Sequence, residues 1–279
     1  MPIAPSVFLL VLFAALLHAS WNAIIKSSPN TLLDSITLTI AAAVLAGCVL
    51  PFLPLPAPAA WPWLGASVAL HVCYFLLLGA VYRHGDLSHV YPLMRGVAPM
   101  LVALVGVVWL GESLSAAMWT GIALICAGIL LPVLRHPQAL AARATSLALV
   151  SALITAAYTL VDGNGTRLSG HSLSYCLWMF LLEAPPLVLA ASFTQGGALW
   201  VHARRRWRHA AAGAFCVLGS YSIALWAMVS APIAAVAALR ETSVLFAALI
   251  GCTLLGEKLG TWRIGGAAVI ACGMAMLRL

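Results

Sequence analysis

Long apolar runs, each close to the length of a membrane span, fill most of this sequence. A helix needs about 20 apolar residues to cross the hydrocarbon core of a bilayer. Ten segments approach that length: Pro5 to Lys26, Leu32 to Leu53, Trp61 to Tyr82, His89 to Leu110, Ala116 to Leu134, Ser146 to Asp162, Leu173 to Phe193, His209 to Val229, Ile233 to Leu255 and Thr261 to Leu277. The pattern therefore predicts an all-α integral membrane protein with ten transmembrane helices, because a helix satisfies its backbone hydrogen bonds internally.

The same pattern occurs twice in the chain. Arg95 is followed by Gly111-Glu112, and both features return 145 positions later as Arg240 and Gly256-Glu257. Across residues 95–128, 12 of 34 positions are identical to their later counterparts. Apolar composition alone would not reproduce an arginine and a glutamate, so we infer an internal duplication. The first repeat covers residues 1–138 and the second covers residues 139–279.

Five helices in each repeat are an odd number, which fixes how the two copies relate. The second copy must enter the bilayer from the opposite side, as an inverted repeat about an axis in the membrane plane. If the fourth helix begins near His89, Arg95 lies roughly 9–10 Å inside the membrane at the helical rise per residue. Arg240 should lie equally deep from the other face, so the two arginines should flank the midplane.

Composition and charge agree with a membrane protein. The chain is 63% hydrophobic and 8% charged, which is too little charge for the surface of a soluble domain of this length. The net charge of +7 does not indicate nucleic acid, because the basic residues outside the two repeated arginines lie mainly in short connections. Ten of them fall in odd-numbered connections, against only Arg167 and Arg278 elsewhere, which predicts cytoplasmic odd connections and external termini. The N-terminus lacks the basic residues of a signal peptide, so the first run is expected to remain as a span.

Arg95 and Arg240 are the strongest candidates for function. A charge in the middle of a span costs about 2.5–3.5 kcal/mol on insertion scales and usually faces a cavity or a partner. The guanidinium fork suits a carboxylate or phosphate ligand. The alternative is a structural role, either as an ion pair with Glu183 or Glu241 or in a bond to carbonyls near Pro92.

Polar and aromatic side chains in the spans could enclose a substrate. Several are related by the repeat, Trp21 with Tyr158, Asn22 with Thr159 and Tyr74 with Tyr221, and transporter sites form at repeat interfaces. The predicted substrate-binding residues are therefore Arg95, Arg240, Trp21, Asn22, Tyr74, Tyr91, Tyr158, Thr159 and Tyr221. The alternative is a purely structural role, in which each ring packs in the core or at the membrane interface.

A few other groups are assigned secondary roles. Glu183, Glu241 and His18 are candidates for coupling or for an ion pair, and for Glu183 a proton-carrying role and an arginine partnership both remain open. Glu112 and Glu257, beside glycine, are predicted to cap the helix that follows each. Gly121, Gly128 and their copies Gly266 and Gly273 would let the fifth and tenth helices approach closely, as scaffold or in a homodimer.

Catalysis is not indicated. The sequence contains no HExxH, GxSxG or Walker pattern and no clustered Cys/His motif, so no catalytic residue, metal or cofactor is predicted. The seven cysteines are scattered through apolar runs and are expected to be free thiols. Without an ATP-binding module, any pumping would use a gradient.

The chain resembles the EamA-type drug/metabolite transporter superfamily, in its ten-helix bacterial branch. The resemblance rests on the ten spans in two copies, the Gly-Glu corner in each copy, and the stretches from His18 to Asn22, Tyr91 to Gly96 and Ala238 to Ser243. It implies a central cavity lined by the first, third, fourth, sixth, eighth and ninth helices, with the fifth and tenth as outer scaffold. It also implies termini in the cytoplasm, which is the reverse of what the charge count predicts.

We therefore predict a secondary transporter in a bacterial inner membrane. Its substrate would be a small organic metabolite that bears a carboxylate or phosphonate or is zwitterionic, carried by alternating access between the repeats. Export of cationic or neutral drugs is the alternative, and a lipid translocase or a scaffold without transport activity is a different class. The expected partners are the small-molecule substrate and the lipid bilayer.

Overall fold

The structure is helical throughout the part of the chain that it describes. A computed structural model describes residues 3–28, 30–84, 87–133, 142–254 and 260–279, and no strand occurs in these ranges. The helices are α1 (Pro5–Lys26), α2 (Thr31–Val49), α3 (Trp61–His84), α4 (Leu87–Leu110), α5 (Ala116–Leu130), α6 (Ala142–Ser169), α7 (Ser172–Gln195), α8 (Gly197–Ser230), α9 (Ile233–Glu241), α10 (Ser243–Leu254) and α11 (Thr261–Arg278). Two 3-10 turns, η1 (Leu50–Phe52) and η2 (Pro58–Ala60), lie between α2 and α3. The all-α prediction is confirmed.

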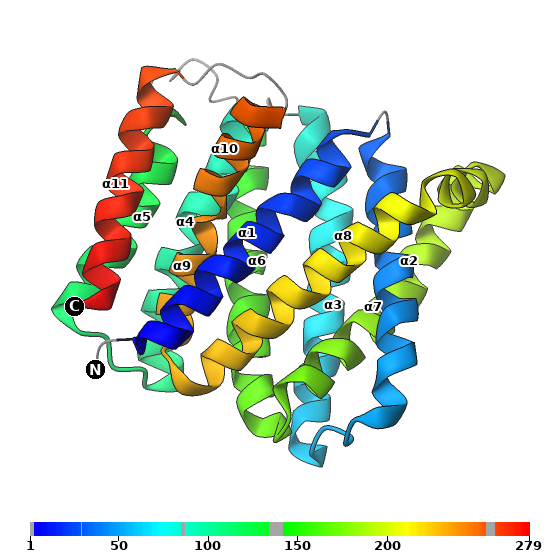
Figure 1. Cartoon of the computed structure of the whole chain (residues 1–279), viewed down its shortest axis with the longest axis horizontal. Coiled ribbons are helices and arrows are strands. Elements are labelled where there is room, and N and C mark those ends of the chain that lie inside the picture. The colour runs from blue at the N-terminus through cyan, green and yellow to red at the C-terminus, as the bar shows by residue number, and fades with distance from the viewer. Residues whose placement is uncertain (1–2, 29, 85–86, 134–141, 255–259) are drawn as a thin grey trace.

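The ten predicted spans are recognisable, with one of them in two pieces (Figure 1). Among the described residues, eight helical segments are long and apolar enough to cross a membrane, and α5 is a shorter apolar helix. The predicted ninth span is divided at Thr242, where α9 ends and α10 begins. The predicted ends at Leu134 and Leu255, and the corner Gly256-Glu257, lie outside the described residues.

The predicted end of the sixth span at Asp162 is wrong. Helix α6 continues to Ser169, so Asp162 lies inside the helix and is fully buried. The stretch from Asp162 to Gly165 resembles a helix stop because it combines aspartate, asparagine and two glycines. These glycines instead serve packing: a Cβ at Gly163 would collide with Ile233, and one at Gly165 would collide with the Tyr175 ring.

The predicted start of the eighth span at His209 is also wrong, because α8 begins at Gly197, and the basic residues between the seventh and eighth predicted spans lie in its first turns. Asp34 on α2 binds this first part of α8 through two basic side chains. His202 Nε2 lies 2.5 Å from Asp34 Oδ1, and an Arg206 guanidinium nitrogen lies 2.9 Å from Asp34 Oδ2. Basic residues that look like a loop in the sequence therefore form a helix that is paired with a carboxylate from the first repeat.

Helices α5 and α11 show how the two repeats are related. They lie side by side (Figure 1). A Cβ at Gly121 would lie 2.8 Å from the Gly273 carbonyl oxygen, and one at Gly128 would lie 2.7 Å from that of Gly266. Since Gly266 is the copy of Gly121 and Gly273 is the copy of Gly128, each glycine meets the copy of the other. Such reciprocal pairing is the signature of a two-fold axis, here between antiparallel helices.

The other helix contacts show the same two-fold relation, because a contact between two helices recurs between their counterparts in the other repeat. Helix α1 packs on α8, and its counterpart α6 packs on α3, the counterpart of α8. Helix α4 packs on α6, and its counterparts α9 and α10 pack on α1. Helices of the two repeats therefore pack against each other, and the interior between α1, α4, α6 and α9 is lined by both repeats.

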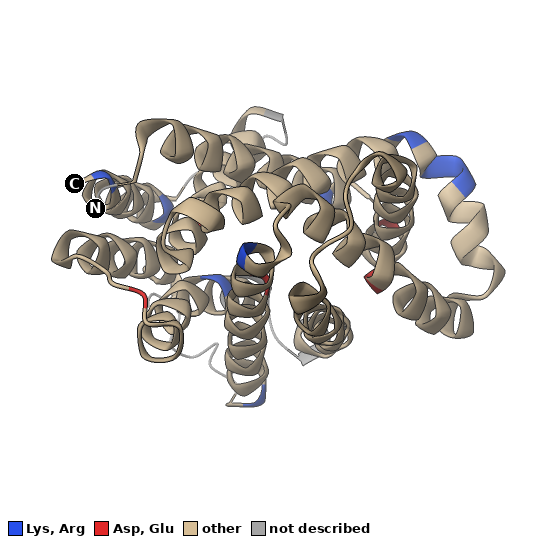
Figure 2. Cartoon of the chain, turned by 90° about the horizontal axis from the view of Figure 1, so that it is seen from below, with Lys and Arg blue, Asp and Glu red and all other residues tan. Residues whose placement is uncertain are grey.

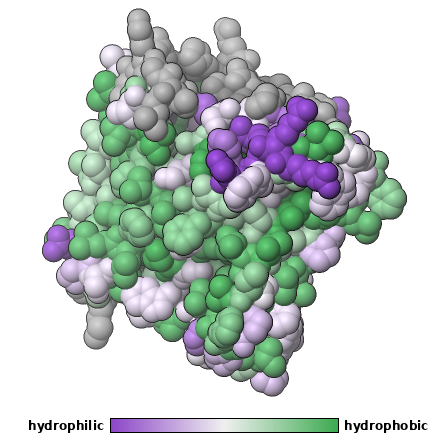
Figure 3. All heavy atoms as spheres, turned by 45° about the vertical axis from the view of Figure 1, so that its right-hand side comes forward, coloured by the Kyte–Doolittle hydropathy of each residue, from purple (hydrophilic) through white to green (hydrophobic). Residues whose placement is uncertain are grey.

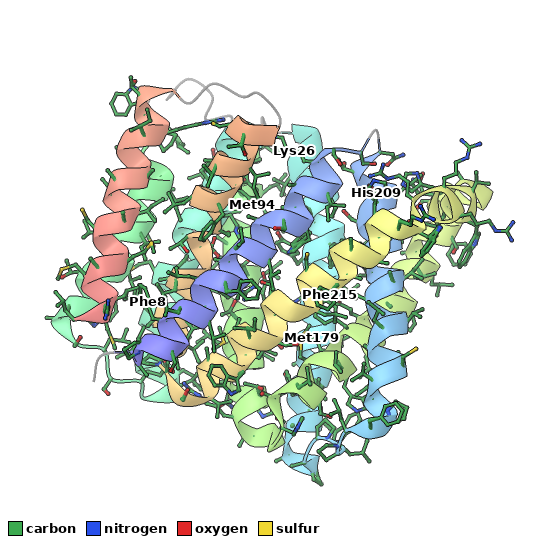
Figure 4. The ribbon with its side chains drawn as sticks, in the orientation of Figure 1. Phe8, Lys26, Met94, Met179, His209 and Phe215 are labelled. Carbon is green, nitrogen blue, oxygen red and sulfur yellow. The ribbon has the colours of Figure 1, made fainter. Side chains whose placement is uncertain are left out.

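The surface is suited to a bilayer and its charge is concentrated at one end. Large apolar side chains are exposed around the helices, among them Phe13, Val108 and Phe215, and Figure 3 shows broad hydrophobic surface beside one hydrophilic patch. Few charges occur along the helices in Figure 2, apart from the basic turns of α8. Lys26 and His209 lie toward the same end of the molecule (Figure 4), which we call the basic end. The chain is a multi-pass membrane protein.

Candidate functional site

A pocket lies in the interior between helices of both repeats. Its walls come from α4, α6 and α9, and the lining residues are Arg95, Ala98, Pro99, Val102, Thr155, Tyr158, Thr159, Ala237, Arg240 and Glu241. The pocket is small, with room for little more than water, so an organic solute would enter only if the lining helices moved apart. Both repeated arginines reach this one space.

Arg95 is neutralised by a carboxylate. Its Nε lies 2.8 Å from Glu241 Oε2, and both side chains are about nine-tenths buried. A second guanidinium nitrogen lies 3.1 Å from His18 Nε2. Because arginine can only donate, His18 Nε2 accepts this hydrogen bond. Of the two carboxylates that the sequence offered to an arginine, the structure gives the role to Glu241 and not to Glu183.

Arg240 has a different environment. Its guanidinium carbon lies 4.8 Å from the centre of the Tyr221 ring, in a cation–π contact. The Nε atoms of both arginines are buried outside hydrogen-bond geometry, but no carboxylate of the described residues lies within ion-pair distance of Arg240. Arg240 therefore keeps unused donors beside the pocket, whereas Arg95 has its partner.

Both arginines lie near a point where helical hydrogen bonding is incomplete. Pro99 lies four residues after Arg95 in α4 and cannot donate a hydrogen bond to the Arg95 carbonyl. In the second repeat, α9 ends one residue after Arg240, and the Thr242 N–H turns back to the Leu239 carbonyl at 3.1 Å. Helix α4 is continuous past Pro99, whereas α9 is separated from α10, and discontinuous helices expose backbone polar groups at the binding sites of many transporters.

The predicted aromatic residues form the wall behind the pocket. Tyr158 lines the pocket, and its ring centre lies 4.3 Å from that of His71 and 5.9 Å from that of Tyr74. The Tyr221 ring is packed edge-on against Phe180, at 5.8 Å. Of these three predicted tyrosines, only Tyr158 lines the pocket. Tyr221 contacts the Arg240 guanidinium with its ring face, and Tyr74 packs edge-on against the Tyr158 ring.

Of the other predicted residues, Thr159 lines the pocket, and the polar groups of Asn22 and Thr159 bond to carbonyls of their own helices. The Asn22 amide donates to the His18 carbonyl at 2.8 Å, and the Thr159 hydroxyl donates to that of Thr155 at 2.7 Å. Trp21 packs edge-on against His18 at 5.0 Å. Tyr91 lies one turn before Arg95 on α4. The structure thus gathers the predicted set around one region, while Trp21, Asn22, Tyr74, Tyr91 and Tyr221 are not lining residues of the pocket.

Asp162 is a buried acid that the sequence analysis did not assign to a site. The Tyr221 hydroxyl donates a short hydrogen bond to Oδ2, and the Tyr175 hydroxyl lies 3.3 Å from Oδ1. Tyr175 can approach because residue 165 is glycine. Thr155, Tyr158, Thr159 and Asp162 are spaced at three and four residues, which places them on one helix face and was a usable signal. The apparent helix stop concealed that Asp162 lies in the interior.

Glu112 has a capping role that differs from the prediction. Helix α5, which follows it, is capped by the Ser115 hydroxyl, 3.2 Å from the Met118 nitrogen. Glu112 Oε1 instead accepts from the Ile233 N–H at the start of α9, at 2.9 Å, and from Arg167 at 2.8 Å. A carboxylate at a helix N-terminus is stabilised there, but the helix belongs to the other repeat. The corresponding prediction for Glu257 lies outside the described residues.

The glycines predicted as scaffold or dimer contacts are used within one chain. All four lie between α5 and α11, where the two backbones touch. A homodimer through these helices remains a prediction, and it would have to use their other faces.

The chain is similar to known proteins in both sequence and fold. The model described as "EamA-like transporter family" matches residues 5–134 and 142–279, one match in each half. No curated protein sequence matches the chain. A solved structure described only as "Crystal structure of protein" is similar with a TM-score of 0.74 at 18% identity, covering 98% of this chain and 98% of that one. At this identity the likeness shows the fold alone.

Proposed function

Since this chain belongs to the EamA-like transporter family, whose members transport small molecules across membranes, we propose that it carries an organic solute with a carboxylate or phosphonate group. The solute binds in the pocket between α4, α6 and α9, and its anionic group meets Arg240. A zwitterionic solute such as an amino acid belongs to the same class, because Glu241 lines the pocket and can accept from an ammonium group.

The observation that carries this proposal is the unpaired guanidinium of Arg240. Two arginines and one glutamate line the pocket, which leaves one positive charge without a carboxylate. A buried charge is costly unless it is paired, and a guanidinium offers paired N–H groups that match a carboxylate or phosphonate. An anionic ligand supplies the missing partner.

The transport cycle we propose is alternating access between the inverted repeats. It is supported by the position of the pocket between α4 of the first repeat and α6 and α9 of the second. It is also supported by the Glu112 network, which ties α9 and α6 to the first repeat away from the basic end. Opening the pocket toward that side separates Glu112 from Arg167 and from α9.

We place the protein in a bacterial inner membrane. Lys26 and the basic first turns of α8 lie at the basic end (Figure 4), which supports its assignment to the cytoplasm. A reporter fused to the C-terminus and another inserted near Arg204 would give opposite results in this orientation. The same compartment for both reporters would contradict the ten-span arrangement.

Export of cationic or neutral drugs through Glu183 has less support. Glu183 is buried and is not a lining residue of the pocket, and the pocket has a positive surplus. The translocase and scaffold alternatives predict no saturable flux of soluble substrates.

The test is a ligand panel on the purified protein. Benzoate, methylphosphonate and L-phenylalanine represent the proposed classes, and tetraphenylphosphonium represents cationic drugs. We expect at least one of the first three to raise the unfolding temperature, because a ligand that binds only the folded state stabilises it, and to be exchanged across liposome membranes. Arg240→Ala should abolish both effects, while Arg204→Ala, an exposed arginine on α8, should preserve them. Stabilisation by the cation alone would overturn the proposal.

A further inference from the structure

A second group of titratable side chains lies behind the pocket. Asp162 on α6 and Glu183 on α7 are 0% and 2% exposed, and neither lines the pocket. Tyr175 and Tyr221 donate to Asp162, and His71 on α3 lies beside it, with its ring 6.1 Å from that of Tyr221. We call these five residues the acidic cluster.

The two carboxyl groups of the acidic cluster have unequal partners. Both oxygens of Asp162 accept from tyrosine hydroxyls, so this side chain has the surroundings of a hydrogen-bond acceptor. Glu183 has one oxygen that is buried without a hydrogen-bond partner. None of the arginines or lysines in the described part of the chain forms an ion pair with Glu183, and its electrostatic neighbour is the like charge of Asp162.

Two ionised carboxylates cannot share such a dehydrated space cheaply. Burying one unpaired carboxylate already carries a large desolvation cost, and a second like charge adds repulsion. A bound proton removes this cost, and the unpartnered Glu183 oxygen provides a position for it. The other charged or titratable groups that face the two carboxyls are His71 from α3, Cys176 and Tyr175 from α7, Tyr221 from α8 and, farther away, Tyr158 and Arg240.

Tyr221 connects the acidic cluster to the pocket. Its ring lies under the Arg240 guanidinium, while its hydroxyl donates to Asp162. The positive charge of Arg240 therefore acts on the cluster through one aromatic ring and favours a net negative charge there. An anion bound to Arg240 cancels that influence, and the cluster then gains from taking up a proton. By linkage, a proton on the cluster strengthens anion binding by the same factor.

We propose that Asp162 and Glu183 form a proton-binding site that is loaded together with an anion at Arg240, so that the protein carries anion and proton in the same direction. This inference rests on the proposed function. The proton comes from water on the loading side, binds a carboxylate oxygen of the cluster and leaves to water on the other side. No covalent bond of the solute changes.

The test uses the full-length protein in liposomes that contain a pH-sensitive dye, with methylphosphonate or L-phenylalanine, whichever of these two panel solutes binds better. Benzoate is unsuitable here because neutral benzoic acid crosses a bilayer unaided and would acidify the lumen without the protein, and liposomes without protein serve as the blank. An inward anion gradient should acidify the lumen in the wild type, and an inward proton gradient should drive anion accumulation. Asp162→Asn and Glu183→Gln should each lose roughly tenfold or more of both responses. Both variants should keep the exchange of labelled for unlabelled anion, which requires no net proton movement.

Asp34→Asn is the matched control, since it makes the same acid-to-amide change near the basic end, and it should keep both responses. Calorimetry in buffers of different ionisation enthalpy provides a second readout in detergent. The wild type should take up protons when the anion binds, and the two cluster variants should not.

Each alternative outcome has a definite meaning. Anion flux in the wild type without proton movement, or protons moving against the anion, overturns the inference and leaves the proposed function intact. Cluster variants that keep the coupling, or that are folded but lose exchange, also overturn it. A wild type that carries no panel anion at all overturns the proposed function itself.

Discussion

Arg95 and Arg240 hold the same position in the two repeats, but they are used differently. Arg95 is paired with Glu241 and bonded to His18, whereas Arg240 lies over a tyrosine ring and has no carboxylate partner. The sequence beside each arginine explains this divergence. Residue 241, the neighbour of Arg240, is a glutamate that faces Arg95, while its counterpart in the first repeat is Gly96. A single acidic residue present in one copy therefore makes one arginine structural and leaves the other available.

The largest expected effect is a difference in unfolding free energy between the alanine variants of the two arginines. Arg95→Ala leaves the Glu241 carboxylate buried without its cation, which should lower the free energy of unfolding by about 3–5 kcal/mol. Adding Glu241→Gln should restore much of this loss, because the orphaned charge is removed. Unfolding in detergent would measure both variants. Arg240→Ala is the matched comparison, and an equal loss of stability there would contradict the division of roles.

A second experiment tests whether the contact between α5 and α11 is symmetric, in contrast to the two arginines at the pocket. Gly121→Ala and Gly266→Ala are equivalent changes in the two repeats, and each new methyl group meets a backbone carbonyl of the facing helix. Each should cost about 1–3 kcal/mol through overpacking. Unfolding measurements should give similar values for the two. A large cost for one and none for the other would show that α5 and α11 do not meet on a two-fold axis.

Arg240→Lys should sharpen the assignment of the anion site. Lysine keeps the charge but loses the planar fork, so anion affinity should fall by about tenfold, or about 1.4 kcal/mol. Anion titration followed by thermal unfolding would measure this. The corresponding Arg95→Lys should affect stability more than affinity, and the reverse ranking would exchange the roles of the two residues.

The smallest effect concerns the contact between repeats at Glu112. Glu112→Gln keeps an acceptor for the Ile233 N–H but weakens the bond to Arg167, so the unfolding free energy should fall by about 0.5–1.5 kcal/mol. The Ser115→Ala cap variant of α5 is a control of similar size. If Glu112→Gln has no effect on stability or on transport, the network has no part in holding α9.

The sequence was sufficient for the architecture because its signals there are local or repeated. Apolar length predicted the spans, and the odd number of spans in each copy predicted the inversion. Asp162 and Glu112 were assigned less well because their partners are distant in the chain. Tyr221 and Ile233 lie 59 and 121 residues away from them, and no periodicity links such positions. Likewise, a choice between Glu183 and Glu241 as the partner of Arg95 required three-dimensional contacts.

The break at Thr242 has a mechanical consequence. Helix α9 is only nine residues long, is gripped by Glu112 at its first residue and carries Arg240 and Glu241 at its last two. The break leaves α9 free to shift as a rigid unit without α10. A shift that starts at the Glu112 contact would move the Arg240 guanidinium and the Glu241 carboxylate together, so breaking that contact would change the position of both charges at the bound solute.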